Sequence, residues 1–205
     1  MKRFLIIALL VSVCTIARGI TIDIQCGVLT NAAGTPMNNG YLIQLLADTG
    51  ANGFTAPSAL SFTGSSDDYI IASYTMNSAT EGGQAGADEF VTPSFSLGIN
   101  GLAAGQSLLL RWWPTIYGTS ATAPGAGTSY GQFTTTGTYD GSSSGWTLPA
   151  AGTINLNFIT ASIGGSQPNT TGSAGLTVAG VPEPSTLALA GAGLAALLAA
   201  RRRRR

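Results

Sequence analysis

Residues 20–28 read ITIDIQCGV, and every second residue of this stretch is apolar. Successive side chains of a β-strand point to opposite faces, so the pattern predicts a strand with one buried face. The same alternation occurs in residues 95–99 and 154–158. The number of short strands and Gly-rich turns predicts an all-β fold, a single jelly-roll-like β-sandwich over residues 20–160. Further strands are expected at 41–48, 60–63, 69–76, 107–113 and 132–139.

The first 19 residues have the features of a secretory signal peptide. Lys2 and Arg3 form a basic start, and the apolar core at residues 4–13 is too short to span a membrane. Ala17 and Gly19 are small residues of the kind that signal peptidase recognises. We expect cleavage after Gly19, with cleavage after Ala17 as the alternative. The sequence therefore predicts export, with signal peptidase as the first partner.

The body between the two ends of the chain is acidic. The whole chain has nine basic and nine acidic residues, but Arg111 is the only basic residue within residues 20–180. The same range contains eight acidic residues, so the net charge of the body is −7. Such a body repels nucleic-acid backbones, so nucleic acid is excluded as a partner. Cys26 lies on the apolar face of the first strand, and we expect it to be a small buried side chain.

The composition changes after residue 160. Residues 161–180 are rich in Gly, Ser and Thr, which predicts a flexible linker. They include a sequon at Asn169, where glycosylation is a minor alternative.

Residues 185–200 form an apolar run of 16 residues, somewhat shorter than the about 20 of a typical transmembrane helix. The chain then ends in five cations, which are expected to stay on the cytoplasmic side of a membrane: Arg201, Arg202, Arg203, Arg204 and Arg205. The alternative is a buried core helix with a basic tail. It fits poorly, because a core helix would not end in five adjacent charges.

The apolar run is preceded by the short motif Val181-Pro182-Glu183-Pro184. Motif, run and arginine cluster, in this order, resemble the PEP-CTERM sorting signal. The resemblance covers residues 181–205 and implies recognition by exosortase, a membrane-embedded cysteine transpeptidase of Gram-negative, exopolysaccharide-producing bacteria. It implies a protein anchored transiently in the inner membrane, with its C-terminus in the cytoplasm, before it reaches the outer envelope or extracellular matrix. Four segments are thus predicted: signal peptide (1–19), β-sandwich domain (20–160), linker (161–180) and sorting signal (181–205).

The sequence offers little support for catalysis. It contains no His, which removes His-based triads and His metal clusters. Residues 141–145 match the Gly-x-Ser-x-Gly pattern, but the helix and the His that the pattern requires are missing. The acidic pairs at 67–68 and 88–89 are expected at loop edges, as solvated carboxylates rather than a glycosidase pair. Residues 48–53 only partly match a calcium loop and are interpreted as a tight turn. We predict a protein that is not an enzyme. We also predict no cofactor or metal, with a weak calcium site as the alternative.

The candidate binding residues lie in or near the stretch LLLRWWP at 108–114. In a strand, Trp112 and the even-numbered leucines share one face, whereas Arg111 and Trp113 share the other. One interpretation is that Trp112 fills the interior while Arg111 pairs with an acid or stacks on Trp113. The other is that Arg111, Trp113 and Trp146 form an exposed surface on which sugar rings stack.

These interpretations lead to different functions. The first favours a structural or adhesive protein of the envelope or biofilm matrix. The second makes the domain a carbohydrate-binding module whose partner is exopolysaccharide. A hydrolase of matrix polysaccharide is a distant third, because its catalytic groups are missing.

Overall fold

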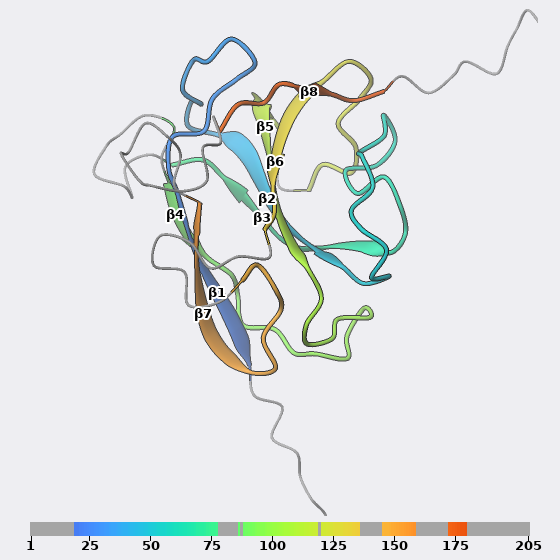
Figure 1. Ribbon diagram of the computed structural model, residues 1–205. Helices are drawn as coiled ribbons and strands as arrows, with labels where there is room; N and C mark the ends of the chain where they lie inside the picture. The colour runs from blue at the N-terminus through green and yellow to red at the C-terminus, as the bar shows by residue number, and fades with distance from the viewer. Residues whose placement is uncertain are drawn as a thin grey trace, which may run out of the picture.

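The computed structural model describes residues 19–77, 86, 88–118, 120–135, 145–158 and 172–179. These residues form two packed sheets and no helix, which confirms the prediction of an all-β, sandwich-like fold (Figure 1). One sheet has the strand order β4-β1-β7 and the other the order β3-β2-β5-β6-β8. The strands are β1 Ile20–Cys26, β2 Tyr41–Asp48, β3 Asp68–Thr75, β4 Asp88–Val91, β5 Leu108–Ile116, β6 Ser129–Phe133, β7 Gly152–Phe158 and β8 Leu176–Thr177.

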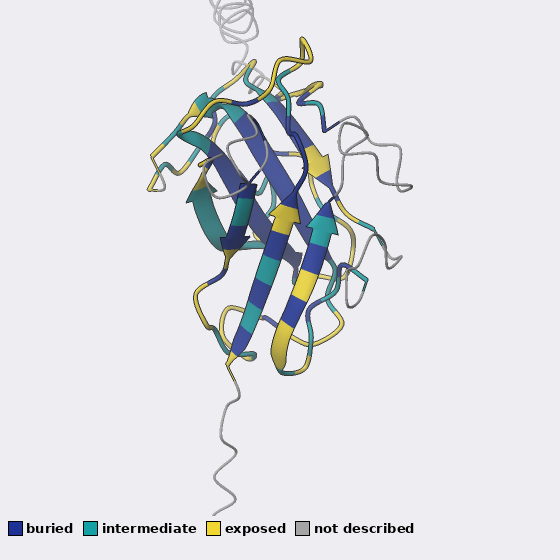
Figure 2. Cartoon of the chain, turned by 90° about the vertical axis from the view of Figure 1, so that its left-hand side faces the viewer, coloured by how far each residue is buried: buried dark blue, intermediate teal, exposed yellow. Residues whose placement is uncertain are grey.

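Strand β1 is the centre of the three-stranded sheet. Its isoleucines and Cys26 are buried against the second sheet, as its alternating sequence predicts, and the residues between them face outward (Figure 2). It pairs antiparallel with β4 and parallel with β7. The parallel pair departs from the wholly antiparallel sheets of a jelly roll.

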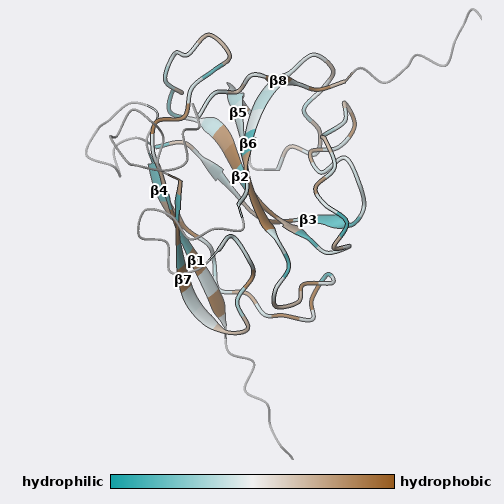
Figure 3. Cartoon of the chain, in the orientation of Figure 1, coloured by the Kyte–Doolittle hydropathy of each residue, from teal (hydrophilic) through white to brown (hydrophobic). Residues whose placement is uncertain are grey.

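The centre of the five-stranded sheet, strands β2 and β5, is buried on both of its faces. Trp112 and the even-numbered leucines of β5 lie in the core between the sheets. On the opposite face, Trp113 belongs to a second apolar cluster that also contains Phe62 and Tyr130. The predicted division of β5 into two faces is therefore confirmed. Loops cover the outer cluster, so β2 and β5 carry near-continuous apolar runs (Figure 3).

The strand expected at residues 95–99 is wrong. Only Phe95 bridges to β1, and Asp88–Val91 occupies that edge instead. Gly98 and Asn100 have positive φ angles of 82° and 53°, so the chain turns away from the sheet there. The strand expected at 60–63 is also wrong, because that segment holds only a bridge between Ser58 and Ser61.

No helix of the described ranges has the length and apolar character needed to cross a bilayer. Most of the predicted signal peptide and the whole predicted sorting signal, with its transmembrane helix, lie outside the described residues. Asn169 lies outside them as well.

Gly131 provides a test of the packing between β5 and β6. It is paired with Trp112, and a Cβ added there would overlap the indole ring of that residue. The ring is buried in the core and cannot move aside, so we expect Gly131→Ala to lower the free energy of unfolding by about 2 to 3 kcal/mol. Gly175→Ala is the matched control, since its added Cβ would meet only the Oγ of Ser173, at 3.9 Å. Equal thermal midpoints for the two variants would contradict this packing.

Candidate functional site

The C-terminal end of the described chain packs onto the domain. Ala174 is fully buried and Val178 is 2% exposed, although both fall within the predicted linker. The linker prediction is therefore wrong for residues 172–179, and the domain extends beyond residue 160. Composition did not reveal this because the segment is held through its backbone and through small side chains. A segment rich in small residues has the composition of a flexible linker.

Backbone hydrogen bonds fasten this segment at both ends. At its start, the Thr30 N–H donates to the Gly172 carbonyl at 2.8 Å, and the Ala174 N–H donates back to Thr30 at 2.9 Å. At its end, the Val178 N–H donates to the Thr128 carbonyl at 2.9 Å. Between them, β8 pairs antiparallel with β6. The segment thus joins the turn after β1 to the edge of the five-stranded sheet.

The segment fixes where the sorting signal leaves the domain. Ala179, the last described residue, bridges to Ser58 in the loop between β2 and β3. In Figure 1, β8 lies at one end of the sandwich, and the start of β1 lies at the other. The two predicted signals therefore adjoin the domain at opposite ends. The predicted sorting motif begins two residues after the segment at residues 172–179.

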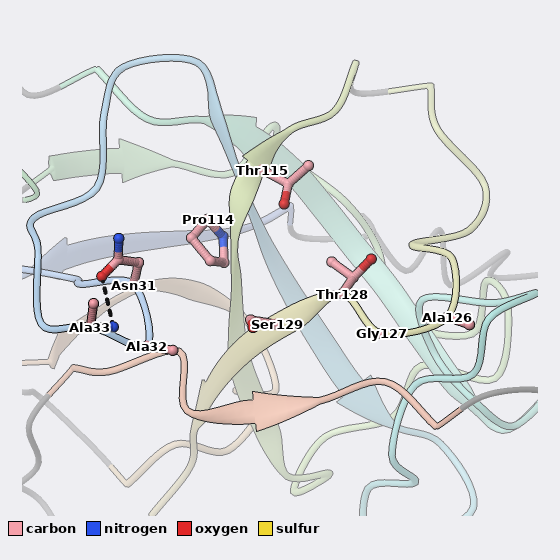
Figure 4. A pocket seen from close by; sticks show the side chains of 9 residues that line it. All are labelled: Asn31, Ala32, Ala33, Pro114, Thr115, Ala126, Gly127, Thr128 and Ser129. Carbon is pink, nitrogen blue, oxygen red and sulfur yellow. Dashed lines mark hydrogen bonds between the residues drawn. The ribbon is translucent and has the colours of Figure 1, made fainter.

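A polar cavity of about 490 Å³ lies beside this segment, between the turn at residues 31–33 and the loop at residues 126–129 (Figure 4). Pro114 lines the cavity and has no backbone N–H group that could donate a hydrogen bond. The pairing of β5 with β6 ends two residues before it, at Trp112. The side chain of Asn31 is occupied by the turn, because its Oδ1 accepts from the N–H groups of Ala33 and Thr35, both at 2.9 Å. None of the nine lining residues is titratable, so this lining offers no acid–base chemistry.

Arg111 lies in the interior of the domain. Its guanidinium is fully buried and donates hydrogen bonds to the Phe62 carbonyl at 2.6 Å, the Thr55 carbonyl at 3.1 Å and Gln132 Oε1 at 3.0 Å. Burial lowers its pKa to about 10, while nearby Tyr130 and Asp68 act to raise it. It therefore remains charged at neutral pH.

These contacts differ from the predicted pairing of Arg111. Within the described chain its hydrogen-bond acceptors are two backbone carbonyls and an amide, so the expected acid partner is not among them. Its guanidinium carbon lies 5.6 Å from the ring centre of Tyr130, and this ring takes the place expected for Trp113. Because its acceptors are neutral, Arg111 is held without a second buried charge. Its hydrogen bonds to Phe62 and Thr55 connect the loop at residues 49–67 to the sheet.

The predicted exposed platform of Arg111, Trp113 and Trp146 is wrong. Trp113 has no exposed surface, and Trp146 is 1% exposed. Trp113 donates its indole N–H to Gln44 Oε1 at 3.0 Å, and its ring packs on Phe62 at a centroid distance of 5.0 Å. Trp113 is buried because loops cover the second face of the sheet, and Trp146 is buried because it packs into the core between the sheets. Alternation within a strand reveals neither arrangement.

Three of the described acidic side chains accept hydrogen bonds from backbone N–H groups of nearby turns and loops. Asp48 Oδ2 accepts from the Gly53 N–H at 2.8 Å, which confirms the predicted tight turn at residues 48–53. Asp68 Oδ2 accepts from the Thr55 N–H at 2.8 Å, and one oxygen of Asp88 accepts from the Asn77 N–H at 2.6 Å. In the ranges that the structure describes, no three acidic or Cys side chains are grouped so as to hold a metal ion.

The comparisons with known proteins bear on the C-terminus. A family model described as the PEP-CTERM protein-sorting motif matches residues 180–204. This range includes Val181, Pro182, Glu183 and Pro184, the apolar run and the first four arginines of the terminal cluster. No curated protein and no solved structure matches the chain.

Proposed function

We propose that this chain, which carries a PEP-CTERM sorting motif and is therefore an exosortase-sorted secreted protein, is a non-enzymatic structural or adhesive component of the outer envelope or extracellular matrix. The observation that carries the proposal is the position of the motif. The matched motif starts at residue 180, directly after the segment at residues 172–179 that is hydrogen-bonded to the domain. The sorting signal therefore follows the domain without an intervening spacer in the sequence.

The properties of the body support a structural or adhesive role. Its only cation is used internally to hold a loop, and Asp48, Asp68 and Asp88 accept hydrogen bonds from backbone N–H groups of turns and loops. The absence of His from the sequence leaves the body without the commonest general base. What remains is a compact acidic domain whose surface is free to contact other matrix components.

The tail supplies the route to this location. The apolar run at residues 185–200 anchors the chain in the inner membrane, and the cluster Arg201 to Arg205 holds the C-terminus in the cytoplasm. An exosortase-type transpeptidase then acts near Val181 to Pro184, and the domain moves to the envelope or to exopolysaccharide.

Protease accessibility tests this topology. In spheroplasts of cells that lack exosortase activity, we expect external protease to leave the segment Arg201 to Arg205 intact, while an epitope inserted after Gly19 is degraded. A matched sample of lysed spheroplasts should lose both. Digestion of the arginine tail from outside intact spheroplasts would contradict the proposed orientation.

A further inference from the structure

We propose that the domain binds a neutral sugar in a cavity between the turn after β2 and the ends of β5 and β6. The cavity has a volume of about 430 Å³, within the range of about 300 to 1,000 Å³ usual for ligand sites. Its apolar lining includes Phe54, whose half-buried ring belongs to the loop at residues 49–67, and Leu109 of β5. This inference names a ligand for the adhesive role proposed above and rests on that role only for its biological setting.

Gln132 supplies hydrogen-bond donors in a fixed orientation. Arg111 has donors only, so the Gln132 atom that it contacts at 3.0 Å is the acceptor Oε1. The Nε2 group therefore points away from the guanidinium, and no described residue accepts a hydrogen bond from it. Because Arg111 is buried and tied to two further carbonyls, this orientation is held before any ligand arrives. Arg111 thus acts as a positioning residue behind an exposed amide.

Acceptors face the same cavity. Asp48 lines it, is 4% exposed and is held in place by the Gly53 N–H at 2.8 Å, with lone pairs left on its carboxylate. Thr134 also lines it, and because its hydroxyl donates to the Leu108 carbonyl, the hydroxyl oxygen keeps its lone pairs as acceptors. The cavity therefore combines an apolar wall, amide donors and two kinds of oxygen acceptor.

This combination matches a pyranose ring. A sugar presents C–H groups that pack on an aromatic or aliphatic wall, and hydroxyls that donate to and accept from fixed polar groups. The net charge of −7 in residues 20–180, with Asp48 at the cavity itself, disfavours sugars that carry carboxylates. A neutral hexose unit of a polysaccharide is the class of ligand that satisfies both conditions.

Affinity electrophoresis of the purified full chain, kept in solution by a detergent without a sugar headgroup, tests the proposal. The probes are dextran, galactomannan and xylan as neutral polysaccharides, and alginate as an anionic one. We expect at least one neutral probe to retard the chain and alginate to have no effect. Absence of retardation by all three neutral probes, or equal retardation by alginate, would overturn the inference.

Two variants locate the site. Gln132→Glu keeps the shape of the side chain and an acceptor for Arg111, but it replaces the amide donors with a carboxylate. We expect it to retain its thermal midpoint and to bind the retarding probe about tenfold more weakly, the loss typical of a missing hydrogen-bond donor. Phe54→Ala should weaken binding to a similar degree.

Leu60→Ala is the matched control, since Leu60 lies in the same covering loop, is 75% exposed and does not line the cavity. Unaltered binding by a folded Gln132→Glu chain would refute the site. The measurement uses purified protein, so a failure of sorting in cells leaves its result unaffected.

Discussion

Replacement of Pro182, Glu183 and Pro184 by alanine is expected to leave export intact while the unprocessed chain accumulates in the inner membrane. The amount of processed protein outside the cell should fall at least about tenfold, as expected when a transpeptidase loses its recognition sequence. Because proline cannot continue a helix, we expect the two prolines to keep this peptide extended, which is the form that an active site can accept. Alanines favour helix, so they would let the predicted transmembrane helix extend toward the domain and hide the bonds to be cut.

The structure adds a control to this experiment. The described contacts of the domain involve residues up to 179 and not the motif itself, so we expect the triple variant to unfold at the same temperature as the parent. Pro168→Ala is the matched substitution, since it changes a proline outside the motif and should leave processing unchanged. Immunoblots of inner-membrane and extracellular fractions give the readout. If the triple variant still appears outside in processed form and normal amount, the sorting assignment fails and the tail is only an anchor.

Arg111→Leu is expected to lower the free energy of unfolding by about 3 kcal/mol, or the thermal midpoint by roughly 10 °C for a domain of this size. The leucine would leave the carbonyls of Phe62 and Thr55 and the amide of Gln132 without the donor that they share. Buried polar groups that lose their partner bear the full cost of desolvation. The loop at residues 49–67 would also lose its link to the sheet.

Arg111→Lys separates charge from geometry. A lysine keeps the positive charge but has no planar fork with which to reach three acceptors, so we expect an intermediate loss of stability. Limited proteolysis within residues 49–67 should become faster in the order parent, lysine, leucine. Equal midpoints for the parent and the leucine variant would show that the buried guanidinium contributes nothing to stability.

The sequence by itself determined several properties of this protein. Alternating residues in β1 and β7 predicted strands with one buried face, because the two-residue period of a strand is local and needs no knowledge of its neighbours. The opposite faces of Arg111 and Trp112 followed from the same period. The sorting motif could be found because it is a contiguous signal, and its matching family model covers residues 180–204.

Only the tertiary structure decided the rest. Whether the second face of β5 meets water depends on the loops that cover it, and these loops buried Arg111 and Trp113. Residues 172–179 are held by the backbone N–H and C=O groups of Thr30 and the backbone carbonyl of Thr128. Because residues of every type carry a backbone carbonyl, these contacts leave no pattern in the amino-acid sequence. The cavity at Gln132 likewise brings together segments far apart in the chain, and its amide is oriented by a neighbour across the sheet. Local periodicity specifies which residues can be buried, but contacts between distant segments decide which of them are.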